Sequence, residues 1–510
     1  MNQYFYKSFD FRGNALDLLD LLRGEPHAFF LDSSQYDPHR GRYSFIGFDP
    51  FDVFVGKGKD TLELLKKKFT QYAGARGRKF TSPFSPLTAG IVGYLGYDYG
   101  LYQEKIRLQA EDDLILPDCS FGFYDCILTI DHFAQKLYVT SSGLPEKDGH
   151  LRERRASQRL AHMVEKLAPY LNKGPECFSI CHPEEPACRR SRRSDEGSHE
   201  ILQPFARLLA RQRLQDDLSV LPLTLRCNFS KQQYMKAVQK ALNYISCGDI
   251  YQVNLSQRFE FDLTGHEFDS LALHQALRNL SPVSFGGYLN CGGFSLISNS
   301  PERFLRLHKG IARTRPMKGT RPRGRNDAQD QKFREELIHS AKEKAELLMI
   351  TDLLRNDLGR VCDYGSIRVK ETRAIEEYQY VFQATSTVEG DLGKGKDCFD
   401  LIRACFPGGS ITGCPKIRAM EIIEELEPTR RGMYTGSMGY ISFDGNMDFN
   451  ILIRTLLAYR DTLYFQVGAG IVADSTPERE YEETLIKARA MRASLGSIPF
   501  KERQAAGTKN

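Results

Sequence analysis

The chain has 510 residues, and its 70 Lys and Arg against 65 Asp and Glu give a formal net charge of +5. So small a charge gives no case for nucleic-acid binding, and no apolar run approaches the ~18 residues that a membrane span needs. Hydrophobic content of 41% and charged content of 26% are those of a soluble globular protein. At ~150 residues per domain, the length indicates two to four domains. The twelve cysteines follow no repeated spacing, and the N-terminus lacks a secretory signal, so we expect free thiols and a cytoplasmic location.

Residues 1–145 are expected to form a sheet-rich region, because "HAFFLDSS", "RYSFIGF" and "FGFYDCILTIDH" are rich in aromatic and β-branched residues. Residues 146–226 are expected to hold a helix, "HLRERRASQRLAHMVEKLAPYL", followed by a poorly ordered linker. The linker, about 175–222, is dense in charge, Pro and Ser and poor in large apolar residues. It contains Cys181, His182 and Cys188, but their spacing fits no standard zinc pattern.

Residues 227–500 have regular elements, and 501–510 are expected to be a disordered tail. Ser230 is placed to cap a helix, and "IYQVNLSQRFEF" alternates as a strand does. "KFREELIHSAKEKAELLMITDLLRNDLGR" predicts one long helix that ends at Gly359, and "PEREYEETLIKARAMRASLG" predicts a terminal helix. Strand-rich runs interleaved with long helices, without strict alternation, predict an α+β fold.

Two residues on one short run of chain are candidates for catalysis. Glu302 in "SNSPERF" follows a rigid Pro301, and a carboxyl in a partly apolar site can act as a general acid. Lys318 in "RPMKGT" can attack carbon only if burial or a cationic neighbour keeps it partly neutral. Arg315 and Arg321 are close in sequence and are expected to lower its pKa. Alone, each residue is more often an ordinary surface group.

Two pairs of glutamates are candidates for a metal site. Glu343 and Glu346 are three residues apart on one predicted helix, and Glu480 and Glu483 are three apart on another. That spacing places each pair on one helix face, where two helices could present carboxylates to Mg²⁺. Surface ion pairs with nearby lysines, such as Lys487, are the commoner alternative.

Glycine-rich stretches and one arginine are candidates for binding an anion. Gly408, Gly409 and Gly413 in "FPGGSITGCPKIRAME" precede a helix whose first amides could receive one. Neither this stretch nor "VGAGIVADSTPEREYEE" matches a P-loop or a dinucleotide fingerprint. Arg454 in "NILIRTLL" is expected in an apolar strand, where it needs a carboxylate partner and could anchor a substrate.

In their order along the chain, these stretches resemble those of the chorismate-utilising enzymes. The resemblance rests on "GDIYQVNLSQRF", "SNSPERF", "RPMKGT", "AELLMITDLLRNDLGR", "FPGGSITGCPKIRAMEIIEELEP", "GSMGYISFDGNMDFNILIRTL" and "VGAGIVADSTPEREYEET". It covers roughly residues 228–495, and the N-terminal region resembles the family's regulatory part. The resemblance implies a catalytic chorismate-binding domain at 227–500 and a fold of two large antiparallel sheets packed as a sandwich and flanked by helices.

Two positions imply a branch of the family. Members that add water to chorismate carry a lysine base where this chain has Gln252, so the resemblance favours addition of ammonia. At the position of Lys318, anthranilate synthases typically have alanine, whereas aminodeoxychorismate synthases have lysine. The chain therefore resembles component I of the aminodeoxychorismate synthases, which serve p-aminobenzoate and folate synthesis.

The resemblance also implies the roles of individual residues. Lys318 would attack C2 of chorismate while Glu302 protonates the departing C4 hydroxyl. Glu346 and Glu483, supported by Glu343 and Glu480, would hold Mg²⁺. Substrate-binding roles are implied for Gln252, Gln383, Ser410, Tyr434, Arg454, Gly468, Gly470 and Lys487. Gln383 stands where many relatives have histidine, so it is expected only to bind. Ser33 corresponds to a serine that contacts tryptophan in relatives, and its pocket here could be regulatory, structural or empty.

The expected partners are chorismate, ammonia, a glutamine amidotransferase subunit (component II) and, at Ser33, tryptophan. No cysteine elbow with a downstream histidine predicts amide hydrolysis in this chain, so the ammonia must come from another subunit or from solution. The sequence leaves two alternatives open. One is component I of anthranilate synthase, which eliminates pyruvate. The other is a non-catalytic subunit that senses chorismate or tryptophan.

Overall fold

The computed structural model describes residues 5–35, 41–73, 82, 84–171, 177–179, 225–378 and 381–502. Most of the predicted linker, including Cys181, His182 and Cys188, lies outside the described residues. Within it, a short strand β9 (Cys177–Ser179) pairs with β1 (Phe5–Asp10), so this part of the linker joins the fold.

The larger of the two main sheets has thirteen strands among the described residues, and every pair in it is antiparallel. In spatial order they are β10 (Leu225–Cys227), β11 (Gln252–Asp262), β24 (Thr462–Ile471), β23 (Thr455–Tyr459), β14 (Phe294–Ser300), β13 (Phe285–Asn290), β2 (Phe29–Asp32), β3 (Tyr43–Gly47), β7 (Cys126–Asp131), β8 (Lys136–Ser141), β1 and β9, with β20 (Gly413–Cys414) beside β11. Strands of the predicted N-terminal and catalytic regions thus share one sheet.

The smaller main sheet has ten strands in the described part of the chain and is also antiparallel. In spatial order they are β17 (Met317–Pro322), β19 (Val381–Asp391), β16 (Ile311–Thr314), β15 (Arg303–His308), β22 (Met447–Asn450), β21 (Ser437–Ser442), β5 (Gly90–Leu95), β6 (Cys119–Tyr124) and β4 (Asp52–Gly56), with β18 (Arg368–Glu377) beside β19. Here too, N-terminal strands pair directly with strands of the catalytic region.

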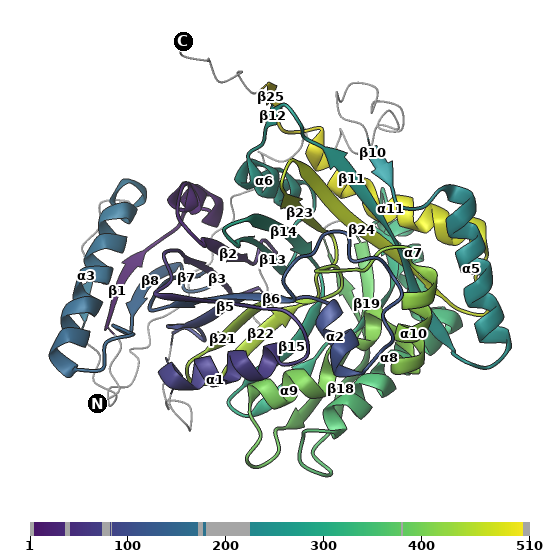
Figure 1. Ribbon diagram of the computed structural model, residues 1–510, viewed down its shortest axis with the longest axis horizontal. Helices are drawn as coiled ribbons and strands as arrows, with labels where there is room; N and C mark the ends of the chain where they lie inside the picture. The colour runs from purple at the N-terminus through teal and green to yellow at the C-terminus, as the bar shows by residue number, and fades with distance from the viewer. Residues whose placement is uncertain are drawn as a thin grey trace.

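The two sheets pack face to face over an apolar core. Phe29 and Leu296 from the larger sheet meet Val92 and Tyr440 from the smaller one, and all four are buried. Alternation along each strand places these side chains inward, as expected of a sandwich. Figure 1 shows the strands across the middle of the molecule, between α3 at one end and α5 at the other. The predicted α+β sandwich flanked by helices is confirmed.

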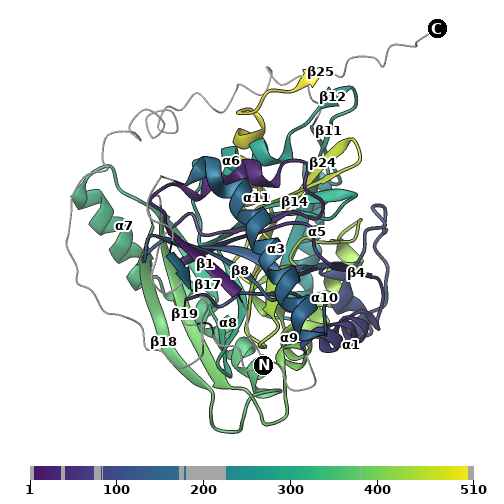
Figure 2. The same cartoon turned by 90° about the vertical axis from the view of Figure 1, so that its left-hand side faces the viewer.

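Helices cover the outer faces of the sandwich. Against the larger sheet pack α3 (Gly149–Leu167), α6 (Ser270–Leu280) and α11 (Pro477–Leu495). Against the smaller sheet pack α1 (Thr61–Ala73), α8 (Ala341–Gly359) and α9 (Cys398–Cys405), with α2 (Asp98–Gln103) close by. Near one end of the larger sheet lie α5 (Lys231–Ser246) and α10 (Lys416–Leu426). Figure 2 shows α7 (Asp327–His339) beside the sheet edge formed by β17, β19 and β18.

Local sequence explains most helix boundaries. Ser230 caps α5 as predicted, since its side chain accepts a hydrogen bond from the backbone of Gln233 and the Gln233 side chain bonds back. The single long helix predicted up to Gly359 is wrong, because α7 and α8 are separate helices. Ser340, with φ −64° and ψ 107°, leaves the helical conformation and caps α8 by accepting from the backbone of Glu343.

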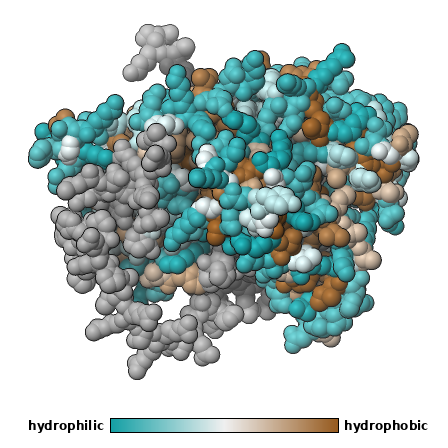
Figure 3. Space-filling view, turned by 90° about the horizontal axis from the view of Figure 1, so that it is seen from below, coloured by the Kyte–Doolittle hydropathy of each residue, from teal (hydrophilic) through white to brown (hydrophobic). Residues whose placement is uncertain are grey.

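The end of the chain also departs from the prediction. Lys501 and Glu502 form β25, which pairs with β12 (His266–Glu267), so the chain remains in a two-stranded sheet beyond residue 500. Residues 503–510 lie outside the described part. No described helix is long and apolar enough to cross a membrane. Exposed apolar residues lie singly or in small groups among hydrophilic ones on the face in Figure 3.

Candidate active site

Glu302 is a buried carboxyl between β14 and β15. It is 5% exposed, and its Oε1 accepts a hydrogen bond of 2.7 Å from the hydroxyl of Ser410. Burial raises the pKa of Glu302 to about 7, while the Ser410 hydrogen bond and the charge of Lys318 oppose that rise. A carboxyl with this pKa can hold or release a proton near neutral pH, which suits a general acid.

Lys318 lies in β17 where the register against β19 shifts, next to Gly319 with φ +80°. Its Nζ is 3.4 Å from the position that a Cβ would take at Gly470, so it crosses from the smaller sheet toward β24 of the larger one. Burial lowers the pKa of Lys318 below its ordinary value, and the charge of Lys487 acts in the same direction. The charges of Glu346, Glu302 and Glu483 oppose this fall. A lowered pKa favours the neutral form of the amine, which is the form that can attack carbon.

The expectation that Arg315 and Arg321 lower the pKa of Lys318 is wrong. Arg315 pairs with Glu376, and Arg321 pairs with Glu343 over 2.7 Å. Each guanidinium is thus compensated by its own carboxylate, and neither is among the charges that act on Lys318. The sequence could not show this, because both carboxylates come from segments distant from the lysine.

The neighbouring strands β11 and β24 form a polar floor beside Lys318. Gln252 is fully buried, and neither atom of its amide group has a hydrogen-bond partner. Its Nε2 is 3.3 Å from the position of a Cβ at Gly470. Because Gly468 and Gly470 have no side chains, polar groups of other residues, such as Gln252 and Lys318, line the space beside them. Lys487 donates a hydrogen bond of 2.8 Å to the carbonyl of Gly468.

Arg454 is the group best suited to hold an anion. It is not in a strand as expected, but lies between β22 and β23 with φ 50°. A non-glycine residue in this conformation is strained, which is typical of sites where a backbone must aim one side chain. Burial lowers the pKa of Arg454, and no carboxylate among the described residues opposes that fall. Tyr434 is also buried, and its hydroxyl lies 3.0 Å from the position of a Cβ at Gly468.

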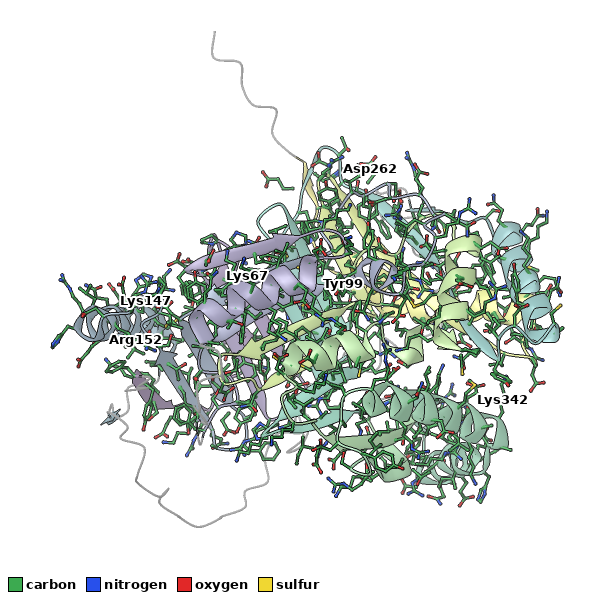
Figure 4. All side chains as sticks on the ribbon, turned by 60° about the horizontal axis from the view of Figure 1, so that its bottom comes forward. Lys67, Tyr99, Lys147, Arg152, Asp262 and Lys342 are labelled. Carbon is green, nitrogen blue, oxygen red and sulfur yellow. The ribbon has the colours of Figure 1, made fainter. Side chains whose placement is uncertain are left out.

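Four glutamates from two helices lie around the same space. The negative charges of Glu346 in α8 and Glu483 in α11 both oppose the fall in the pKa of Lys318. Glu343 keeps one oxygen, Oε2, buried without a partner, and so does Glu480. The positive charge of Lys342 in α8, which Figure 4 labels, lowers the pKa of Glu480 in α11 and so opposes the effect of burial. The N-terminal ends of α8 and α11 therefore lie close to each other.

The glutamate set fits a hard cation in charge and donor type. Buried carboxylate oxygens without a donor are costly, and a divalent cation would compensate them. In the described residues no three acidic, His or Cys side chains converge as a ready-made metal cluster. Glu483 instead pairs with Lys487 over 2.7 Å. A cation here would need that pair to open and would have to take further oxygen ligands from a substrate or water.

Comparison with known proteins fits this geometry. A model of the chorismate binding enzyme family matches residues 27–493. The chain belongs to this family. Anthranilate synthase component 1 of Thermus thermophilus is 37% identical over 482 residues, and aminodeoxychorismate synthase component 1 of Bacillus subtilis is 35% identical over 488 residues. Each alignment covers 93% of both chains.

Solved structures of the family share the fold. The crystal structure of anthranilate synthase component I from Streptococcus pneumoniae has a TM-score of 0.70 at 28% identity, over 90% of this chain and 93% of that one. The menaquinone-specific isochorismate synthase of Escherichia coli has a TM-score of 0.66 at 17% identity, over 97% of this chain and 95% of that one, and bears on the fold alone. The chain is thus a chorismate-utilising enzyme of the group that holds anthranilate and aminodeoxychorismate synthases.

One family position does not join the others through a direct contact. Gln383 is buried in β19 opposite Thr320, and among the described residues no side-chain hydrogen bond connects it to Lys318 or Glu302. Its predicted part in binding stays a prediction.

Arg431 is a residue that sequence reasoning missed. It is 3% exposed, pairs with Glu427 over 2.7 Å and donates to the backbone carbonyls of Asn254 and Ile411. Its guanidinium also lies 5.7 Å from the ring of Tyr434. Arg431 thus ties β11, the turn that carries Ser410 and the loop of Tyr434 together. The sequence does not mark Arg431 as a site residue, because the pair Arg430–Arg431 looks like the exposed arginine pairs that are common on protein surfaces.

Ser33 lies apart from these residues, in a cavity of about 210 Å³ between the two sheets. Its hydroxyl donates a hydrogen bond of 3.0 Å to the carbonyl of Ser284. Arg306, Tyr43 and Asp448 also line the cavity. The structure therefore places Ser33 in a polar pocket that is separate from Lys318 and large enough for a small ligand.

Proposed function

We propose that the chain is component I of an aminodeoxychorismate synthase, which converts chorismate and ammonia to 4-amino-4-deoxychorismate. The observation that carries the proposal is Lys318, a lysine with a lowered pKa beside Gly470 and the unpaired amide of Gln252. Lysine at this position is expected of aminodeoxychorismate synthases, whereas alanine is expected of anthranilate synthases. Gln252 cannot act as a base, which disfavours activation of water.

In the proposed reaction, Lys318 Nζ forms a bond to C2 of chorismate as the ring double bonds shift and the C4 hydroxyl leaves. Glu302, protonated near neutral pH, gives its proton to that hydroxyl, so water departs. Ammonia then adds at C4, the bonds shift back, and the lysine leaves C2 as an amine. The extra proton on the new amine returns to Glu302, and the chain is restored. Ser410 keeps Glu302 oriented throughout.

The same proposal assigns the binding groups. Arg454 and Tyr434 would hold one substrate carboxylate together with the backbone amides near Gly468 and Gly470. Glu346 and Glu483, with Glu343 and Glu480 in support, would hold Mg²⁺. The ion, when bound, supplies positive charge that neutralises the other substrate carboxylate. Release of Glu483 from Lys487 on binding would leave the lysine to face the substrate.

The ammonia is proposed to come from glutamine through a separate amidotransferase subunit. The relatives from Thermus thermophilus and Bacillus subtilis are both named as component 1, which supports a second component. We expect glutamine alone to be a poor donor for this chain and ammonium at high pH to serve. A cytoplasmic location and a place in p-aminobenzoate and folate synthesis belong to the same proposal.

Component I of anthranilate synthase is the second candidate, favoured by the relative from Thermus thermophilus. A product assay separates the two, with chorismate, ammonium and Mg²⁺ as the only additions and chromatography of the products. We expect 4-amino-4-deoxychorismate. Anthranilate with release of pyruvate would establish the second candidate, and the absence of any product would favour a sensing subunit.

A further inference from the structure

Asp98 is a buried carboxyl of the N-terminal region to which the proposed function gives no role. It is the first residue of α2 and is 6% exposed. Its Oδ1 accepts a hydrogen bond of 3.0 Å from the backbone N–H of Gly432, which lies 334 positions later in the chain. Such a bond fixes two distant segments against each other, because an unpaired polar group in a buried place costs free energy.

The bond from Asp98 reaches the loop that carries Tyr434. Two residues with positive φ flank Tyr434, namely Gly432 at 57° and Thr435 at 61°. A threonine in this conformation is strained, and the strain persists only where surrounding contacts hold the backbone. On one side of Tyr434, the N–H of Thr435 donates to the carbonyl of Leu452 over 2.9 Å. On the other side Asp98 holds Gly432, so the backbone is fixed before and after Tyr434.

The two residues before Asp98 pack against the same loop. A Cβ at Gly96 would lie 2.9 Å from the carbonyl oxygen of Gly432, so a side chain there would push the loop away. The guanidinium carbon of Arg431 lies 4.9 Å from the centre of the Tyr97 ring, in a cation–π contact. Asp98 is therefore part of a continuous contact between the N-terminal region and this loop.

We propose that Asp98 is a positioning residue, which holds the loop so that the hydroxyl of Tyr434 meets the substrate. That hydroxyl lies 3.0 Å from the position of a Cβ at Gly468, on the side of β24. Without the bond the loop can move, and Tyr434 loses its place against the substrate carboxylate. The effect falls on binding, because Glu302 takes its orientation from Ser410 and not from this loop. The inference rests on the binding role of Tyr434 in the proposed function.

Asparagine is the conservative replacement for Asp98. Burial raises the pKa of Asp98 to about 7, the charges of Asp118 and Glu424 act in the same direction, and the bond from Gly432 opposes them. The carboxyl is therefore partly protonated near neutral pH, and a neutral amide of similar shape keeps an acceptor oxygen for the N–H of Gly432. Asp98→Ala removes the acceptor, so the two variants separate the hydrogen bond from the charge.

The test is steady-state kinetics with chorismate as the varied substrate and ammonium as the nitrogen donor. Asp98→Ala should raise the KM for chorismate about tenfold and change kcat less than about threefold, whereas Asp98→Asn should keep that KM within about threefold of the parent value. Asp98→Leu, which fills the space but accepts no hydrogen bond, serves if the alanine variant does not fold. Tyr434→Phe should raise the same KM. The double variant Asp98→Ala/Tyr434→Phe should be no worse than the worse single variant, because Asp98 acts through Tyr434.

Glu424→Ala is the matched control, because Glu424 is also buried and accepts from backbone N–H groups outside the loop, those of Gln109 and Ala110. It should lower stability and leave the KM for chorismate unchanged. An unchanged KM in both the alanine and leucine variants of Asp98, an equal rise in Glu424→Ala, or additive effects in the double variant would overturn the positioning role and leave the proposed function standing. If Tyr434→Phe leaves the KM unchanged, the binding role of Tyr434 fails and this inference fails with it.

Discussion

The hydroxyl of Ser410 donates to Glu302 Oε1 over 2.7 Å and joins the turn before α10 to the loop after β14. This bond lowers a pKa that burial raises to about 7. The bond therefore links the two segments of chain that would position the carboxyl of Glu302, the proposed proton donor, against the substrate.

Ser410→Ala should therefore raise the pKa of Glu302 further. A general acid works in its protonated form, so the fall in kcat/KM on the alkaline side should move to higher pH. We also expect kcat to fall about tenfold, because the carboxyl loses its orientation. The pH profiles of parent and variant test both effects. A profile that keeps its alkaline limb in place would show that Glu302 is not the group that titrates.

Glu302→Gln should abolish turnover and stabilise the fold at alkaline pH. Because the pKa of Glu302 is raised in the folded state, folding binds a proton between the ordinary carboxyl pKa and about 7, and stability falls across that window as pH rises. Glutamine does not titrate, so the variant should gain on the order of 2 kcal/mol at pH 8 and little at pH 4. Urea unfolding at the two pH values measures this. An equal gain at both would indicate better packing rather than relief of a buried charge.

Glu346→Ala and Glu483→Ala should each abolish turnover while the protein stays folded. Carboxylate oxygens are the preferred ligands of Mg²⁺, and these two come from different helices. The checks are activity across a Mg²⁺ titration and circular dichroism. Lys344→Ala, an exposed change on the same helix, should leave the Mg²⁺ dependence intact. Full activity of either glutamate variant after EDTA treatment would contradict the metal assignment.

The cavity at Ser33 should bind tryptophan. A ligand that binds only the folded state raises the melting temperature with its concentration, so millimolar tryptophan should shift Tm upward. Ser33→Leu would intrude on the cavity and should abolish the shift while leaving ammonia-dependent activity unchanged. Isothermal titration provides a direct check. The same shift in parent and variant would place the binding elsewhere, and no shift in either would leave the pocket without this ligand.

The fold and the main site residues were accessible from the sequence for different reasons. Glu302 and Lys318 stand in short motifs whose order along the chain identified a family, and the sandwich followed from that family. The sequence does not predict the break between α7 and α8, because Ser340 lies in a run of good helix formers. Its extended backbone and its capping bond to Glu343 show the interruption in the structure.

Long-range pairing was the part that the sequence could not give. Arg315 and Arg321 are near Lys318 in sequence but pair with Glu376 and Glu343. Arg454 looked like a strand residue, because the apolar run around it hides a single residue with positive φ.

The most direct test of whether Lys318 attacks the substrate is mass spectrometry. The chain is incubated with chorismate and Mg²⁺ but without ammonia, and its peptides are then analysed. We expect a covalent adduct on the peptide that contains Lys318. Lys318→Ala should lose the adduct and slow 4-amino-4-deoxychorismate formation by more than about 100-fold. Lys318→Arg should not restore the rate, because a guanidinium stays protonated and cannot attack carbon. The absence of an adduct, together with an active Lys318→Arg variant, would contradict the nucleophile and leave Lys318 only an electrostatic role.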